Sequence, residues 1–90
     1  THSGRVRRMQ FVFKIDALGE IRFTISQPIL NPEQTAWVCP IEWSGVEHRS
    51  IKIYGATSVQ SLELALAFMR SELKAVASGK PITQLGTPFF

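Results

Sequence analysis

Cysteine, aspartate and histidine are scarce in this sequence of 90 residues. It has one cysteine, two histidines and a single aspartate, Asp16. Because a lone Cys39 cannot form an internal disulfide, a reducing and cytoplasmic compartment is expected. A zinc site needs three or four His, Cys or acidic ligands close together, and the chain offers no such set. We therefore expect neither a metal nor a cofactor.

Long apolar runs are also missing. No stretch approaches the ~18 apolar residues of a membrane span, which excludes a transmembrane role and predicts no membrane partner. The apolar run that follows the basic N-terminal residues is interrupted by Lys14 and Asp16. It is therefore not typical of a signal peptide.

The basic excess of the chain is confined to its N-terminus. The net charge of +3 equals the contribution of Arg5, Arg7 and Arg8, since the remaining seven basic residues balance the seven acidic ones. A nucleic-acid-binding domain usually carries its excess on a folded face. Residues 1–8 are thus interpreted as a solvated basic leader that could be flexible, and a phosphate-contacting arm is the alternative.

Apolar residues alternate with polar ones between residues 9 and 54, which predicts β-strands with one buried face. Odd-numbered hydrophobes fill residues 9–15 and 21–25, and a turn containing Gly19 joins the two runs as a hairpin. A second hairpin is expected from residues 37–43 and 51–54. Pro40 implies an edge position or a bulge in the third strand. Residues 28–34, with a proline near each end, are predicted to be a connection.

The apolar period changes to that of a helix after Gly55. Thr57 and Gln60 fit a capping box, and Gly79 followed by Pro81 provides a stop, so a helix is predicted over about residues 58–77. The expected fold is an α+β domain with a four-stranded antiparallel meander packed on one C-terminal amphipathic helix. The domain spans residues 9–80, and residues 81–90 form an apolar tail.

The residues that could carry chemistry do not form a catalytic set. Cys39 is expected on the buried strand face while His48 lies in a polar loop, so the two do not pair. A serine triad would need Asp16 from a distant turn. Glu42 and Glu47 could be neighbours across the second hairpin, but exposed carboxylates of this kind are typical of surface. The turn before the helix favours a plain cap over an anion site.

The helix carries a second apolar stripe. By the 100° step, Leu64 and Phe68 lie opposite the face centred on residues 62, 69 and 73, and Ser71 and Ala75 extend the stripe. A helix that is apolar on two sides is covered on both. The cover is either the tail ending in Phe89 and Phe90 or another protein chain, which includes a second copy in a homodimer.

Two stretches resemble a family of small bacterial domains of unknown function, over about residues 20–77. Those domains have a Trp-x-Cys strand, here Trp37 to Cys39, and a Gly-x-Asp-Ser-Val-Gln-Ala-Leu helix start, here Gly55 to Leu62. This chain departs from the pattern with Thr57 in place of the Asp and Ser61 in place of the Ala. The resemblance implies a bacterial, cytoplasmic domain and brings no catalytic residues.

These observations favour a non-enzymatic protein-interaction module, such as a bacterial immunity or antitoxin-like protein that occludes a partner. Its predicted interface comprises Leu64, Phe68, Phe89 and Phe90. One alternative is a nucleic-acid-binding module that uses Arg5, Arg7 and Arg8, although nucleic acid is the less favoured partner. The other is a small-molecule binder or enzyme with a cleft beside Trp37, Trp43 and His48.

Overall fold

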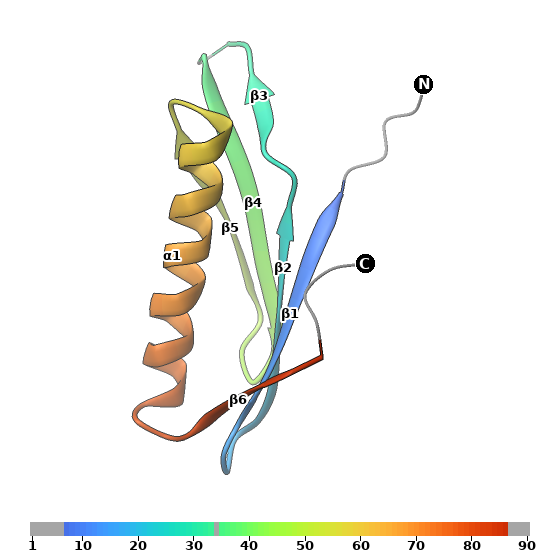
Figure 1. Cartoon of the computed structure of the whole chain (residues 1–90), viewed down its shortest axis with the longest axis vertical. Coiled ribbons are helices and arrows are strands. Elements are labelled where there is room, and N and C mark those ends of the chain that lie inside the picture. The colour runs from blue at the N-terminus through green and yellow to red at the C-terminus, as the bar shows by residue number, and fades with distance from the viewer. Residues whose placement is uncertain (1–6, 34, 87–90) are drawn as a thin grey trace.

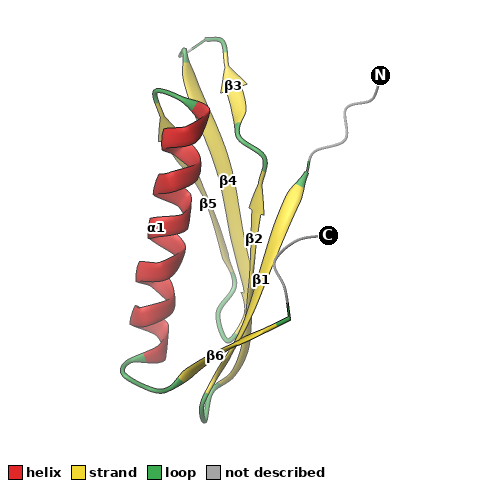
Figure 2. Cartoon of the chain, viewed as in Figure 1, coloured by secondary structure: helices red, strands yellow, loops and turns green. Residues whose placement is uncertain are grey.

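The computed structural model describes residues 7–33 and 35–86. Within these residues the chain forms one helix and six strands, with the helix lying along one side of the strands (Figures 1 and 2). The elements in chain order are β1 (Arg8–Ile15), β2 (Gly19–Ser26), β3 (Ile29–Asn31), β4 (Ala36–Gly45), β5 (Arg49–Gly55), α1 (Ser58–Ala77) and β6 (Ile82–Leu85). The fold is therefore α+β, as predicted.

All strands of the described residues belong to one antiparallel sheet, in which β4 pairs with strands on both of its sides. β5 pairs along one side of β4. Along the other side β2 pairs with residues 41–45 and β3 with residues 36–38, so β3 continues the line of β2. β1 pairs with β2, and β6 pairs with β1. Across its width the sheet runs β5, β4, β2, β1, β6.

This sheet corrects the predicted four-stranded meander, because β3 and β6 join the expected strands. Residues 28–34 are not simply a connection, since Ile29–Asn31 pairs with β4 between the two prolines. The predicted tail, residues 81–90, contributes β6 at Ile82–Leu85. Phe89 and Phe90 lie outside the described residues.

Pro40 lies in β4, which has strands on both sides. The prediction that Pro40 belongs to an edge strand is therefore wrong. Pairing between β2 and β4 ends at Ile41, and pairing between β3 and β4 resumes at Val38. Pro40 thus lies opposite the break between β2 and β3. The ladder on that side is interrupted at the one residue of β4 that has no N–H to donate.

The predicted alternation is confirmed, because the odd-numbered apolar residues of the strands turn to the face that α1 covers. Burial of each large apolar side chain stabilises the fold by roughly 1.5–3 kcal/mol. The buried strand residues are Phe13, Ile15, Ile21, Phe23, Ile25, Cys39, Ile41 and Trp43. The helix supplies the other side of the core, with Ala65, Met69, Leu73 and Ala77.

The helix begins and ends where the sequence predicts. The Gln60 N–H donates to the Thr57 hydroxyl at 3.0 Å, and the Gln60 side-chain oxygen accepts from the Ala56 N–H at 2.6 Å, which completes the capping box. At the other end Ser78 and Gly79 both adopt left-handed conformations, with φ of 53° and 85°. Ser78 donates its N–H to the Lys74 carbonyl and stops the helix.

Candidate interaction site

The helix covers only part of the sheet. Five strand positions at about 4.8 Å spacing make a sheet roughly 19 Å wide, whereas a helix with its side chains is about 10 Å across. α1 packs on β4 and β5. One flank of α1 therefore faces β1 and β2, and the other faces the β5 edge of the sheet (Figure 1).

The two flanks of α1 can be assigned to particular side chains. Leu62 lines a hollow together with Met9 of β1 and Ile25 of β2, so its flank faces those strands. A step of 100° per residue places Leu64 and Phe68 on the opposite side of the buried face. This second flank lies beside β5.

The second flank is only partly exposed, because its two apolar residues differ in burial. Phe68 is half-buried, with its ring centroid 5.7 Å from that of Trp43, so it extends the core. Leu64 keeps 45% of its surface exposed. Phe68 is therefore covered in part by the core of the domain itself, whereas the predicted covers were the C-terminal tail or another chain.

β5 is an edge strand of seven residues. Among the described residues it pairs with β4 alone, so the backbone groups on its other side have no strand partner. Ile51 and Ile53 point under α1 but stay only half-buried, since no further strand or helix of the described chain lies beyond them. Tyr54, on the opposite face, is 49% exposed.

We define the β5–α1 surface as the unpaired edge of β5 with the flank of α1 above it, namely Ile51, Ile53, Tyr54, Leu64 and Phe68. Around Leu64 and Phe68 the exposed flank is uncharged, because Gln60, Ser71 and Ala75 are its neighbouring residues, and Glu72, one turn after Phe68, lies at the end of the surface. The charged residues of α1 that face water, Glu63, Arg70 and Lys74, lie round the back of the helix. Depletion of charge beside exposed apolar side chains is typical of the centre of a protein interface.

A polar cluster closes one end of this surface, at the loop between β4 and β5. The buried Trp43 indole N–H donates to a Glu47 carboxylate oxygen at 3.2 Å, and Arg49 lies 4.0 Å from the same carboxylate. Burial raises the pKa of Glu72 on α1, and the neighbouring Glu47 carboxylate raises it further, against a smaller lowering by Arg49. The cluster ties α1 to the loop.

Glu42 is exposed, in line with the prediction that it belongs to the surface, and it is not the carboxylate that meets Glu47. Glu42 lies on the exposed outer face of β4, opposite Ser50 of β5. The carboxylate that the structure brings to Glu47 is that of Glu72, a residue 25 positions away in the sequence. No local spacing could have indicated this contact, since it depends on how far α1 runs along the sheet.

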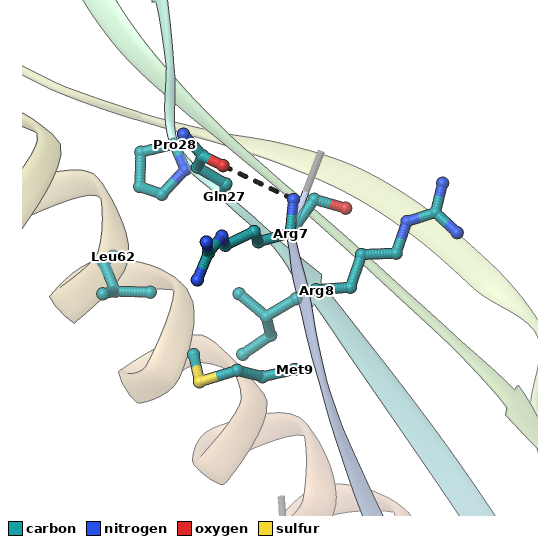
Figure 3. A pocket seen from close by; sticks show the side chains of 8 residues that line it. Arg7, Arg8, Met9, Gln27, Pro28 and Leu62 are labelled. Carbon is teal, nitrogen blue, oxygen red and sulfur yellow. Dashed lines mark hydrogen bonds between the residues drawn. The ribbon is translucent and has the colours of Figure 1, made fainter. Parts of the chain in front are cut away.

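The hollow beside Leu62 lies at the opposite flank of α1, between the helix and the start of β1 (Figure 3). Its volume is about 210 Å³, and Met9, Ile25, Pro28 and Leu62 form most of its apolar lining. Figure 3 shows the Arg7 side chain directed towards the helix and that of Arg8 directed away from it.

Arg7 and Arg8 therefore do not form one basic strip. Neighbouring residues of a strand point to opposite faces, which separates Arg7 from Arg8. The Arg7 backbone N–H is already engaged within the chain, because it donates to the Gln27 side-chain oxygen at 3.4 Å (Figure 3). Arg5 lies outside the described residues, so the nucleic-acid alternative stays a prediction.

Cys39 and His48 lie apart, as expected. The Cys39 thiol is buried and donates to the Ser26 carbonyl at 3.3 Å, and burial raises its pKa, so the thiolate is disfavoured. His48 is exposed in the loop after β4. It lines a hollow with Trp43, whereas Trp37 lines a different one near the start of α1. The three residues of the predicted cleft do not meet.

Metal ligation and membrane crossing can both be assessed from the described side chains and helix. Over residues 7–33 and 35–86, no group of three or more His, Cys, Asp or Glu side chains is placed to hold a metal ion. In the same part of the chain, no helix has the length and apolar character needed to cross a membrane.

Comparison with known proteins identifies the family. The model of a family described as a domain of unknown function, DUF6968, matches residues 6–85, so the chain belongs to this family. The match includes β6, in agreement with the sheet. No curated protein and no solved structure matches the chain. The expected resemblance to domains of unknown function is confirmed at this level, and a bacterial origin stays a prediction.

Proposed function

We propose that this DUF6968 domain is a non-enzymatic protein-interaction module that binds a protein partner through the β5–α1 surface. One observation carries the proposal: the seven-residue edge of β5, which no strand of the described residues pairs, lies directly beside a helix flank that exposes Leu64 and is uncharged around it. The edge offers backbone hydrogen bonds and the flank offers apolar area, which is the combination used in strand addition.

The surface supports this role better than the hollow at Arg7 does. Strand addition needs an accessible row of N–H and C=O groups, and β5 supplies it over the whole length of the strand. The hollow at Arg7 has no exposed strand edge of comparable length, since β2 pairs with all of β1 on one side and β6 pairs with Val12 to Ile15 on the other, which leaves only residues 8–11 of β1 without a strand on that side in the described chain. Binding at β5 also leaves the core intact, because α1 and β4 already cover it.

An immunity or antitoxin-like role is the specific form of this proposal. Such a protein acts by occluding a partner, and it needs only a surface of the right shape and chemistry. A toxin gene directly beside the gene for this chain would support this form. The reducing, cytoplasmic setting favoured by the lone Cys39 belongs to the same proposal.

A photo-crosslinking residue placed at position 64 tests the binding surface in cells that carry the gene. We expect a discrete protein adduct from position 64 and none from position 70, where Arg70 is exposed on the back of α1. Equal labelling from both positions, or no discrete adduct from position 64, would refute the proposed surface. Thermal unfolding of both labelled proteins controls for damage to the fold.

A further inference from the structure

The β5–α1 surface has the symmetry needed to bind a copy of itself. We propose that its partner is a second copy of this chain, paired antiparallel along β5 about a two-fold axis at Ile53; this inference rests on the proposed function of the surface. The two sheets would continue into one, and both α1 helices would lie on the same face.

The residues of β5 select this register. Residues paired across an antiparallel ladder share a face, so a two-fold axis must pass through a residue position in the middle of the strand. An axis at Lys52 would place two lysines opposite each other, which is unfavourable. An axis at Ile53 pairs Ile53 with itself and Lys52 with Tyr54 of the other copy, so each ammonium meets an aromatic ring. An axis at Ile51 leaves exposed Tyr54 without a partner.

The helix supports the same axis. A Cβ at Gly55 would lie 2.6 Å from the Ser61 backbone nitrogen, so Ser61 is level with Gly55. α1 runs back along β5 (Figure 1). Ile53 is two strand residues from Gly55, about 6.6 Å, and this distance corresponds to about four helix residues. Ile53 is therefore level with about residue 65, and Leu64 lies close to the axis.

The flank of α1 suits a second helix near this axis. Leu64 would meet Leu64 of the other copy, and the flanking Gln60, Ser71 and Ala75 bring no charge into the contact. The C-terminal segment is a less suitable cover for the same surface, because β6 lies at the opposite edge of the sheet from β5. β1, which follows the N-terminal segment, is also separated from β5, by β2 and β4.

The interface is small beside the ~800 Å² per partner of a standard complex, so we expect a dimer that dissociates on dilution. Sedimentation velocity over a concentration series of the purified full chain measures it. Leu64→Glu places two carboxylates at the axis and should weaken the dimer about tenfold or more. Val59→Glu is the matched control, because Val59 is 63% exposed on the other flank of α1. It should leave the dimer unchanged.

A charge series at Tyr54 tests the register. Tyr54→Lys would place like charges opposite each other at two symmetric positions and should weaken the dimer. Tyr54→Glu would pair with Lys52 of the other copy and should preserve or strengthen it. If the two variants behave alike, the axis at Ile53 is wrong. Circular dichroism of each variant verifies that it is folded.

A chain that stays monomeric up to about millimolar concentration, where even a weak association of roughly −4 kcal/mol is populated, would overturn self-association. So would a dimer that survives Leu64→Glu unchanged. If the purified chain is monomeric but position 64 crosslinks to a different protein in cells, only the identity of the partner is refuted. If the purified chain is monomeric and position 64 gives no discrete adduct in cells, the proposed function fails as well.

Discussion

Replacing Gly55 by alanine is expected to destabilise the domain, although Gly55 has an ordinary backbone conformation. It lies at the end of β5, where the first turn of α1 passes over the strand. A Cβ there would lie 2.6 Å from the Ser61 nitrogen and 2.9 Å from the Ser61 Cα. These are backbone atoms of the helix, so no change of rotamer relieves the contact.

The magnitude follows from two opposing effects. Overpacking of a tight contact costs about 1–3 kcal/mol, and a clash with the backbone belongs at the upper end. The lower entropy of alanine in the unfolded chain offsets about 0.4–1 kcal/mol of this cost. We expect a net loss of about 1–2 kcal/mol in the free energy of unfolding. At about 4–8 °C per kcal/mol, Tm should fall by roughly 5–15 °C.

Thermal and urea unfolding measure this loss, and two variants identify its cause. Ser61→Gly should not rescue Gly55→Ala, because the obstacle is the backbone of residue 61 and not its side chain. Gly79→Ala tests a different cost, since a Cβ at Gly79 meets nothing within 4 Å but the residue has φ of 85°. Only Gly55→Ala should alter the fluorescence of Trp37, which lies near the start of α1. A Gly55→Ala protein as stable as the parent would refute the close approach of α1.

Three further outcomes are expected. Thr57→Ala removes the side-chain acceptor for the Gln60 N–H and should cost about 1 kcal/mol; an unchanged Tm would contradict the capping role. Native Cys39 should resist thiol reagents until the protein is unfolded, because burial raises its pKa, and rapid labelling of the folded protein would count against this. A carboxyl whose pKa is raised by folding contributes stability at low pH that is lost as pH rises through the raised value. Glu72→Gln should therefore raise Tm at about pH 7 and have less effect at about pH 4, because the raised pKa of Glu72 favours its neutral form as the pH falls, whereas an equal effect at both would refute the contact.

The sequence predicted the parts of the fold that rest on burial. Apolar and polar residues alternate in the strands between residues 9 and 25 and between residues 37 and 53, because one face of each strand lies under α1 or beside it. This period of two can be recognised in the sequence alone. The helix was predicted at its observed bounds, since Thr57 and Gln60 form a local cap that depends on nothing distant. The exclusion of a Cys39–His48 pair followed from the same alternation.

The missed strands have no burial pattern to reveal them. All four residues of β6 are exposed, so no apolar period marks Ile82–Leu85 as a strand. β3 is three residues long and lies between two prolines, which are typical of a connection. Both strands exist because a neighbouring strand offers a free edge, and a free edge is a property of the assembled sheet.

The same reasoning explains why the sequence predicted only part of the candidate surface. The 100° step identified Leu64 and Phe68 as apolar positions outside the main helical face, but it could not place the helix on the sheet. Once α1 packs on β4 and β5, Phe68 reaches Trp43 and joins the core, while Leu64 is left beside a strand whose outer edge is unpaired. Exposed Leu64 by itself is ordinary surface, since scattered apolar side chains are common there. Its position near half-buried Ile51 and Ile53 is the reason why we propose that a further strand and helix, from a second copy of the chain, cover this surface.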